Sequence, residues 1–289
     1  MKRFILIVLS VLMLFSVACD KKEPDRLADG SVRFTKENFP RVCVTPYSQR
    51  LGEYFASAVL GVSSEEAKLS ITVCNTTDEC YLKLIAGECD IVIAHGYGKA
   101  VTAELDKTAL ELTTTELKRD ALVFMGNGLN PDGLTKEQIA SVYKGEVSNW
   151  NALGGSDASV TLFGAKSGTA AQNAFEQYIA ADVTVPFVYK TITTADGEFE
   201  AEIDFDNRKG AIGYTLFSLA GNFNNGTITP VKIDNVTPDA ETIKNGQYPL
   251  SFPVGVTIRS SEAAGNNVRV LYDWLLSNQG KTSLGIELQ

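Results

Sequence analysis

Short apolar runs rich in β-branched residues alternate with helical patterns along most of the chain. The runs typical of strands lie at residues 42–44, 71–73, 91–94, 121–125, 211–216 and 254–258. Such alternation predicts an α/β fold in which the sheets are largely parallel.

Four segments between these runs have helical spacing of their apolar residues. Ser48 can cap the first helix, Thr135 and Gln138 form a capping box for the second, and Gly145 stands where a left-handed C-terminal cap belongs. A third helix is expected to open at 167–169 and a fourth lies near the end of the chain. The positions expected to be buried in these helices are Leu51, Tyr54, Phe55, Ala58, Val59, Ile139, Val142, Tyr143, Ala171, Phe175, Tyr178, Ile179, Val268, Leu271, Tyr272, Leu275 and Leu276.

Residues 1–18 have the three parts of an export signal: basic Lys2 and Arg3, an apolar stretch over 4–15, and small residues at 16–18. The apolar stretch is too short to span a bilayer comfortably, and small residues directly before Cys19 are the pattern that the lipoprotein signal peptidase cuts. We therefore expect Cys19 to become the lipidated N-terminus, which anchors the protein on the periplasmic or cell-surface side of a membrane. An ordinary secretory signal followed by a chance cysteine is the alternative.

Residues 19–39 are rich in charged side chains and lack apolar periodicity, which predicts a tether, with the folded part starting at residue 40. The net charge of the whole chain is −9, so we expect neither nucleic acid nor an anionic lipid surface as a partner. This acidity does not forbid an anionic ligand, because backbone amides can bind an anion locally.

Four cysteines follow Cys19, namely Cys43, Cys74, Cys80 and Cys89. An even number in an oxidising compartment suggests two disulfides, and three pairings are open. The short spacing of Cys74 and Cys80 favours that pair together with Cys43 and Cys89. A zinc site is the competing interpretation, but the chain has no Cys-x-x-Cys motif and a single histidine, so we expect no metal and no cofactor.

A series of motifs in the middle of the chain carries a family resemblance. They are GLTKEQI at 133–139, YKG at 143–145, SNW at 148–150 and GG at 154–155, preceded by RDALVF at 119–124 and followed by SGT at 167–169 and Phe175. In this order they resemble the phosphate ABC transporter substrate-binding family, the PstS-like proteins. Later segments at 210–214, 248–251 and 274–280 are also similar, so the resemblance extends from about Val42 to the end of the chain.

The resemblance implies a type II periplasmic-binding-protein fold, in which each of two lobes has a central mixed sheet flanked by helices and the ligand lies in the cleft between them. The chain would cross between lobes near 119–125 and 247–253. Lobe 1 would comprise 40–122 and 248–289, and lobe 2 would comprise 123–247. The implied function is capture of a small oxyanion, phosphate above all, for an ABC transporter permease, by a monomer.

The turn Ser167-Gly168-Thr169 is the first candidate for ligand binding. It opens a helix, so it places unpaired amides and two hydroxyls at the positive end of the helix dipole, and Gly168 allows close approach of an anion. A plain N-cap is the structural alternative. The resemblance assigns the opposite wall to Thr45, Tyr47 and Ser48, where simple capping by Ser48 is an equal alternative.

The chain departs from the family pattern at three positions. Phosphate binders have an arginine four residues before the serine of this turn and an acidic residue between them, and here these are Phe163 and Ala165. Lys166 can supply a point charge, but it lacks the planar fork of arginine. The family's aspartate after the run at 89–94, which accepts the proton of phosphate, is His95 here.

These departures predict a site that has lost the family's bias against fully deprotonated oxyanions such as sulfate. A weaker phosphate site and a sensor or interaction lipoprotein without an oxyanion ligand are the alternatives. For His95 the structural alternative is a partly buried histidine bonded to backbone.

An enzyme is not expected. Ser167 and His95 are the one conceivable pair of nucleophile and base, but the sequence around Ser167 lacks the glycines two residues away on each side that mark a nucleophile elbow. A hydrolase would therefore rest on a chance pairing of these two side chains.

Overall fold

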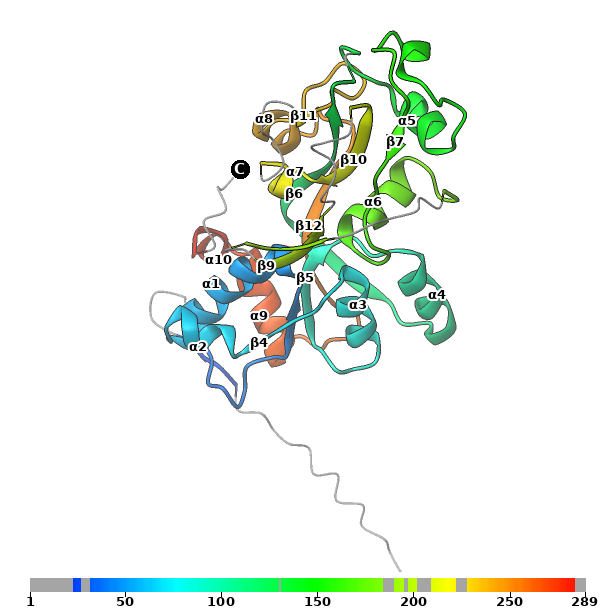
Figure 1. The fold of residues 1–289 in the computed structure, drawn as a ribbon. Helices are drawn as coiled ribbons and strands as arrows, with labels where there is room; N and C mark the ends of the chain where they lie inside the picture. The colour runs from blue at the N-terminus through cyan, green and yellow to red at the C-terminus, as the bar shows by residue number, and fades with distance from the viewer. Residues whose placement is uncertain are drawn as a thin grey trace, which may run out of the picture.

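The computed structural model describes residues 23–26, 32–129, 131–183, 190–194, 197–201, 209–221 and 228–283. They form two lobes, one above the other in Figure 1, and the long strand β6 and strand β12 run from one lobe to the other. No helix among these residues is long and apolar enough to cross a membrane. The expected signal peptide at 1–18 and Cys19 lie outside the described residues.

The strands of the first lobe form a sheet in the order β4-β3-β5-β12-β6. Their bounds are β3 Val42–Val44, β4 Ile71–Val73, β5 Ile91–His95, β6 Leu112–Asn127 and β12 Ser251–Arg259. Strand β3 pairs in parallel with β4 and β5, whereas β12 is antiparallel to both β5 and β6. The expectation of largely parallel sheets is therefore wrong, because the two strands that connect the lobes run antiparallel to their neighbours.

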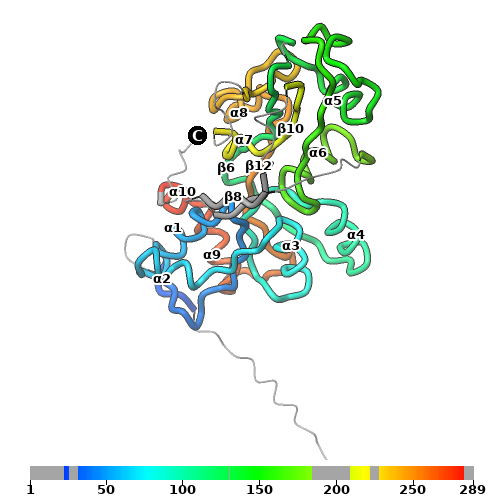
Figure 2. The backbone as a smooth tube through the Cα atoms, viewed as in Figure 1, coloured from blue at the N-terminus to red at the C-terminus, as the bar shows by residue number. Residues whose placement is uncertain are grey.

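The second lobe is built on the C-terminal half of β6. Residues 122–126 of β6 pair antiparallel with β10, and β10 pairs in parallel with β7. The strands added here are β7 Thr161–Leu162, β10 Ala211–Leu216 and β11 Ile228–Pro230. Figure 2 shows the chain passing between the lobes along β6 and β12. The exact lobe boundaries stay a prediction.

Helices cover both faces of the first-lobe sheet and surround the second-lobe strands (Figure 1). Those of the first lobe are η1 Pro46–Ser48, α1 Gln49–Leu60, α2 Ser64–Lys68, α3 Thr77–Ile85, α4 Lys99–Thr108, α9 Asn267–Leu276 and α10 Asn278–Ser283. Those of the second lobe are α5 Lys136–Tyr143, η2 Trp150–Leu153, α6 Ala170–Tyr178, α7 Phe217–Ala220 and α8 Ala240–Lys244.

Alternation along the short strands divides the first-lobe core into two layers. Val44 and Ile93 face the layer that includes α1 and α9, while Cys43 and Val92 face the layer that includes α3 and α4. The second lobe has its own core of aromatic residues around Phe124, in which the rings of Phe175 and Tyr214 stack with centroids 4.5 Å apart.

Most expected helix faces are buried as predicted, including Leu51, Phe55, Val59 and the α5 stripe. The capping box of α5 is present, and Gly145 has the left-handed φ of 78°. Three expected positions are wrong. Tyr54 is 49 % exposed on the outer side of α1, Ala58 four residues later is exposed as well, and Tyr178 at the end of α6 is 36 % exposed.

The folded region begins before residue 40. Strands β1 Asp25–Arg26 and β2 Val32–Arg33 pair antiparallel, and Phe34 is 2 % exposed in the core of the first lobe. The ring of Phe39 packs against both Phe34 and Phe55. The expected tether over 19–39 is therefore wrong for residues 32–39, whose few apolar side chains suffice to dock them.

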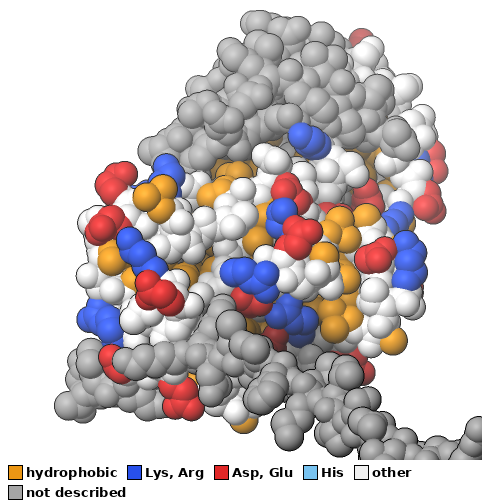
Figure 3. Space-filling model, turned by 90° about the horizontal axis from the view of Figure 1, so that it is seen from below, with side chains coloured by type: hydrophobic (Ala, Val, Ile, Leu, Met, Phe, Trp, Pro, Cys, Tyr) orange, Lys and Arg blue, Asp and Glu red, His pale blue; other side chains and the backbone are white. Residues whose placement is uncertain are grey.

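The hairpin of β8 Lys190–Thr194 and β9 Gly197–Ala201 lies beside η1 at the boundary between the lobes. On the face seen from below in Figure 3, basic and acidic side chains are interspersed with hydrophobic ones. That face therefore has mixed charge.

Candidate functional site

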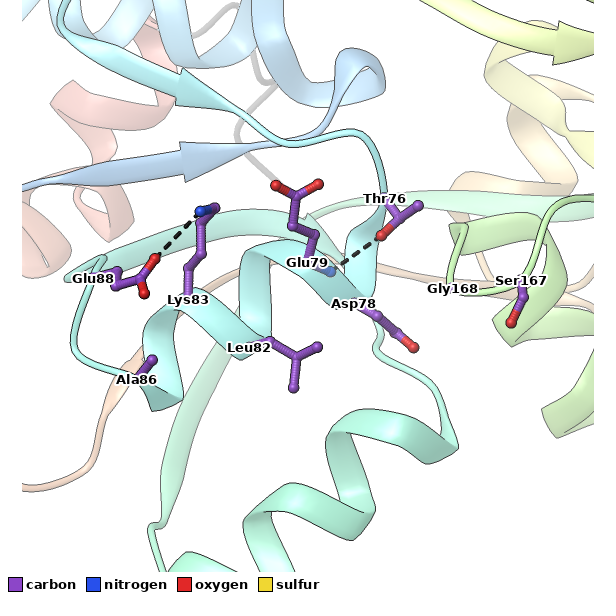
Figure 4. Close-up of a pocket in the computed structure, with 9 residues that line it drawn as sticks. All are labelled: Thr76, Asp78, Glu79, Leu82, Lys83, Ala86, Glu88, Ser167 and Gly168. Atoms are coloured by element: carbon purple, nitrogen blue, oxygen red, sulfur yellow. Dashed lines mark hydrogen bonds and ion pairs between the residues drawn. The ribbon is translucent and has the colours of Figure 1, made fainter.

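The two lobes touch where the N-terminus of α3 faces the N-terminus of α6 (Figure 4). The backbone amide of Asp78 donates to the carbonyl oxygen of Gly168 at 3.1 Å. Gly168 has a φ of +77°, and a Cβ placed on it would lie 3.4 Å from Cβ of Asp78 and 3.5 Å from Oγ1 of Thr76. The left-handed backbone conformation favours glycine at this position, whereas the contacts with α3 are at ordinary van der Waals distance.

The turn before α6 has the geometry of an N-cap. Thr169 donates its hydroxyl to the carbonyl oxygen of Lys166 at 2.6 Å and accepts from the amide of Gln172 at 3.4 Å. Lys166 and Ser167 are exposed, and Ser167 lines the pocket beside the turn. Of the two residues expected to offer a hydroxyl, Thr169 uses its own in capping, whereas Ser167 is exposed and lines the pocket.

The carboxylate of Asp78 joins three helix N-termini. Its Oδ1 accepts from the backbone amide of Gly98, which precedes α4, at 2.8 Å and from Nδ2 of Asn173, on α6, at 2.8 Å. Asp78 is 8 % exposed. An acidic side chain thus lies at the candidate turn, although not at the position where the family resemblance places one.

A second contact between the lobes surrounds Lys99 at the start of α4. Its Nζ donates to the carbonyl oxygen of Ala181 and lies 3.9 Å from carboxylate oxygens of Glu176 and Asp182. These groups are on α6 and in the segment that follows it. Lys99 is 60 % exposed, so this contact contributes less to stability than the buried one of Asp78.

A pocket of about 420 Å³ opens where α3 meets the turn. It is lined by Thr76, Asp78, Glu79, Leu82, Lys83, Ala86, Glu88, Ser167 and Gly168. Lys83 lies 3.3 Å from a carboxylate oxygen of Glu88, and this hydrogen bond raises the pKa of Lys83. The remaining charged side chains of the lining, Asp78 and Glu79, are acidic.

The hydroxyls expected on the opposite wall are used inside the protein. Ser48 donates to the carbonyl oxygen of Ile93 at 2.5 Å and accepts from the amide of Thr45 at 3.0 Å, and the hydroxyls of Ser48 and Thr45 are hydrogen-bonded at 3.1 Å. Thr45 and Ser48 are 1 % and 2 % exposed. Both side chains therefore fasten η1 to β5. Tyr47 is half-buried, and its ring packs edge-on against that of His95 with centroids 6.3 Å apart.

His95 is the last residue of β5, beside Val254 of β12, and its side chain reaches β6. Its Nε2 lies 3.0 Å from Oδ2 of Asp120, which also accepts from the hydroxyl of Ser218 at 2.8 Å. The same carboxylate accepts from the amides of Ala121 and Ser218 through Oδ1. His95 is 3 % exposed, and its Nδ1 has no hydrogen-bond partner among the described residues. The side chain of His95 therefore bonds to the carboxylate of Asp120. A hydrolase with Ser167 as its nucleophile would need His95 to bond to Ser167 instead.

The environment of Asp120 keeps it ionised. Burial acts to raise the pKa of this carboxyl, but the hydrogen bond and charge of His95, with the bonds from Ser218 and Ala121, leave the pKa below its ordinary value. Asp120 lies on β6 and Ser218 on α7, so this buried cluster ties the connecting strand to both lobes.

The position of the family's arginine has become part of a core. Phe163 is 9 % exposed in the second lobe, and its carbonyl oxygen accepts from the hydroxyl of Tyr143 at 2.9 Å. No positive charge at this position reaches the pocket.

The four cysteines are free thiols, so the expected disulfides Cys43–Cys89 and Cys74–Cys80 are absent from the structure. They lie together in the core layer under α3, where Cys43 contacts Cys74 and Cys89, and Cys74 contacts Cys80. Cys89 donates instead to the carbonyl oxygen of Ile91 at 3.0 Å. Within the described ranges, no group of three or more His, Cys, Asp or Glu side chains is arranged to hold a metal ion.

The structure thus brings together Ser167, Gly168 and Thr169 but places Thr45, Ser48 and His95 in internal hydrogen bonds. Sequence reasoning missed Asp78, Asn173 and Asp120. The position of Asp78 directly after Thr76 and Thr77, at the start of a helix that follows a strand, was the signal that could have found it.

Comparison with known proteins identifies two relatives by sequence. A phosphate-binding protein PstS of Bacillus subtilis is 31 % identical over 134 residues, which cover 45 % of this chain and 42 % of that protein. PstS of Borreliella burgdorferi is 20 % identical over 190 residues, 62 % of this chain and 64 % of that protein. The matched region therefore spans less than two thirds of either relative.

The fold agrees with that of solved binding proteins. An ABC-type phosphate transport receptor from Vibrio cholerae superposes with a TM-score of 0.60 at 17 % identity, over 85 % of this chain and 97 % of that one. The expected α/β class, with two lobes of mixed sheet and flanking helices in a type II periplasmic-binding-protein fold, is confirmed. A family model described as a PBP superfamily domain matches residues 50–279, and the chain therefore belongs to the PBP superfamily.

Proposed function

We propose that this chain is an extracytoplasmic solute-binding lipoprotein that captures a small oxyanion, phosphate above all, for an ABC transporter. One observation carries the proposal: the Ser167-Gly168 turn at the N-terminus of α6 lies at the boundary of the lobes, directly against the N-terminus of α3. Helix N-termini present unpaired amides and a positive dipole end, which together attract anions. The names of the curated relatives, both phosphate-binding proteins, support this assignment.

Ligand capture would work through the contact between the lobes. An oxyanion that accepts hydrogen bonds from the α6 turn and from α3 at the same time binds the closed arrangement more tightly than an open one, and so shifts the population toward closure. Strands β6 and β12, which connect the lobes, would act as the hinge. The carrier would then present its closed form to a permease, with Cys19 as the lipid anchor outside the cytoplasm.

The alternative is a binding protein for another oxyanion, or a sensor or interaction lipoprotein of the same fold that does not bind phosphate. Two observations favour it. Phe163 occupies the position of the family's arginine within a core, and His95 bonds to Asp120 away from the pocket.

Calorimetric titration of the chain without residues 1–19, stripped of bound anions, tests the proposal. Phosphate, sulfate and molybdate would be titrated into the wild type, Ser167→Ala and, as a control, Ser261→Ala, which removes an exposed hydroxyl beyond the end of β12. We expect saturable phosphate binding that Ser167→Ala weakens by about tenfold or more, the effect of one hydrogen bond to a charged group. A wild type that binds none of the three anions would move the assignment to the sensor alternative.

A further inference from the structure

The segment that follows β2 fastens the start of the folded chain to the first lobe. The amide of Phe34 donates to the carbonyl oxygen of Val59, on α1, at 2.8 Å. Nδ2 of Asn267, on α9, donates to the carbonyl oxygen of Asn38 at 3.0 Å. The rings of Phe34 and Phe39 are buried in the core of this lobe. Release of the segment would expose both rings to water, so the docked arrangement is strongly favoured.

The docked segment places the start of the chain at one end of the molecule. Figure 1 shows β1 and β2, in dark blue, at the end of the first lobe farthest from the second lobe. Asp25 of β1 pairs with Arg33 of β2, and Nη1 of Arg33 donates to the carbonyl oxygen of Ala58 at 3.4 Å. The hairpin is therefore held against the last turn of α1.

The expected lipid anchor lies only six residues before this hairpin. Residues 20–24, which we call the leash, connect Cys19 to Asp25. Six residues of fully extended chain span about 20 Å at most. A docked β1 strand thus stays within this distance of the membrane surface that holds Cys19.

The size of the folded part converts this short reach into an orientation. A globule of about 250 residues has a radius of gyration of about 18 Å, which corresponds to a width of roughly 45 Å. The leash is less than half as long, so the second lobe cannot rest on the membrane while Cys19 is inserted. Lying on its side would need a nearly fully stretched leash, which costs conformational entropy.

The charges at this end of the molecule fit a lipid surface without net charge. Figures 1 and 2 show α2 beside β1 and β2. The exposed side chains of α2 and of the docked segment carry both signs, namely Lys36, Glu37, Glu65, Glu66 and Lys68. Such a mixture gives little net attraction to an anionic surface, whereas zwitterionic headgroups offer partners of both signs.

We propose that the end of the first lobe that carries β1, β2 and α2 is a membrane-contact surface, held against zwitterionic lipid headgroups by the short leash. This inference rests on the lipid anchor of the proposed function. The second lobe points away from the bilayer, and the boundary between the lobes lies above the membrane by the height of the first lobe.

Energy transfer to the membrane surface tests this orientation in the full, lipidated chain. The protein would be reconstituted into phosphatidylcholine vesicles that contain an acceptor dye on the lipid headgroup. A donor dye would be attached to Lys36→Cys, in the docked segment, or to Ala152→Cys, in η2 of the second lobe; both positions are exposed. The four core cysteines are at most 2 % exposed, so the dye reacts with the introduced thiol. Thermal unfolding checks that both variants keep the fold.

A lengthened leash is the matched control. About 20 Gly and Ser residues inserted after Asp20 add a coil with a root-mean-square length of roughly 25 Å and leave Cys19 and Asp20 in place. With the natural leash we expect transfer at least about twofold more efficient from residue 36 than from residue 152, which lies on the far side of a globule roughly 45 Å wide. With the long leash the two efficiencies should become nearly equal.

Three results would overturn the inference. Equal transfer from both positions with the natural leash, or stronger transfer from residue 152, would exclude the proposed orientation and leave the proposed function intact. A difference that the long leash leaves unchanged would show that the leash is not its cause. Mass spectrometry that finds no lipid on Cys19 would remove this inference together with the anchor, while oxyanion binding would still be decided by calorimetry.

Discussion

At the scale of the residue, Asp120 is a buried acid that links β6 to both lobes. It accepts hydrogen bonds from His95, Ser218 and Ala121 and is 4 % exposed. Because burial desolvates every partner, the loss of its charge leaves donors without acceptors, which is costlier than the loss of a surface interaction.

We predict that Asp120→Asn lowers the free energy of unfolding by about 2–3 kcal/mol at pH 7. The pKa of Asp120 is lower in the folded chain than its ordinary value of 3.8. Its ionised form therefore stabilises the fold fully above the pKa of the unfolded chain, and this contribution is lost as the pH falls through the lowered folded pKa.

Urea unfolding of the wild type and Asp120→Asn over a series of pH values measures this contribution. The difference in unfolding free energy should be constant from neutral pH down to about pH 5 and shrink below about pH 4. A difference that stays constant down to pH 3 would show that the substitution acts through shape and not through charge.

At the scale of the element, residues 32–39 are packed against the first lobe, although their composition predicts an unfolded tether. Phe34 is 2 % and Phe39 7 % exposed, and the amide of Phe34 donates to the carbonyl oxygen of Val59 at 2.8 Å.

We predict that the free energy of unfolding of a chain beginning at residue 40 is at least about 3 kcal/mol lower than that of a chain beginning at residue 23, because the shorter chain lacks these buried rings. Guanidinium unfolding would be measured for both chains and for Phe34→Ala in the longer chain, which removes one of the buried rings. Equal unfolding midpoints for all three proteins would contradict the docking of residues 32–39.

The elements that the sequence predicted well are those whose signals are local. The apolar runs at 42–44, 71–73 and 91–94 are strands, and the capping box at Thr135 begins a helix. Residues 112–118 of β6 were not predicted, because their exposed polar side chains give no apolar run and the strand is held by its pairing with β12. Docking of 32–39 was missed for a similar reason, since its few apolar residues show no period.

The residues of the candidate site could likewise be predicted only where their signal is local in sequence. Ser167-Gly168-Thr169 is readable because a turn before a helix is a local signal. Asp78 and Asn173 are 95 residues apart, and Asp120 and Ser218 are 98 apart, so only the packing of the lobes brings them together. His95 was expected in the ligand shell by resemblance, and its bond to Asp120 could not be read from either residue's neighbours in sequence.

At the scale of the whole molecule, Asn173 makes one of the polar contacts between the lobes. Asn173 on α6 reaches both Asp78 and, at 3.4 Å, the carbonyl oxygen of Gly96. Asn173→Ala should therefore shift the ligand-free protein toward an open arrangement and increase its radius of gyration in small-angle scattering. Asn151→Ala, in η2 and exposed, is the control, and equal scattering curves for wild type and Asn173→Ala would mean that other contacts hold the lobes.

The location of a bound anion tests the central claim most directly. Crystals of the chain without residues 1–19, grown with arsenate, would be measured near the arsenic absorption edge, since arsenate is tetrahedral like phosphate and carries a proton near neutral pH. We predict an anomalous peak within hydrogen-bonding distance of the Ser167 hydroxyl, where the N-termini of α3 and α6 meet. A peak elsewhere in the protein, or none at an arsenate concentration that saturates binding in solution, would contradict the assignment of this turn as the oxyanion site.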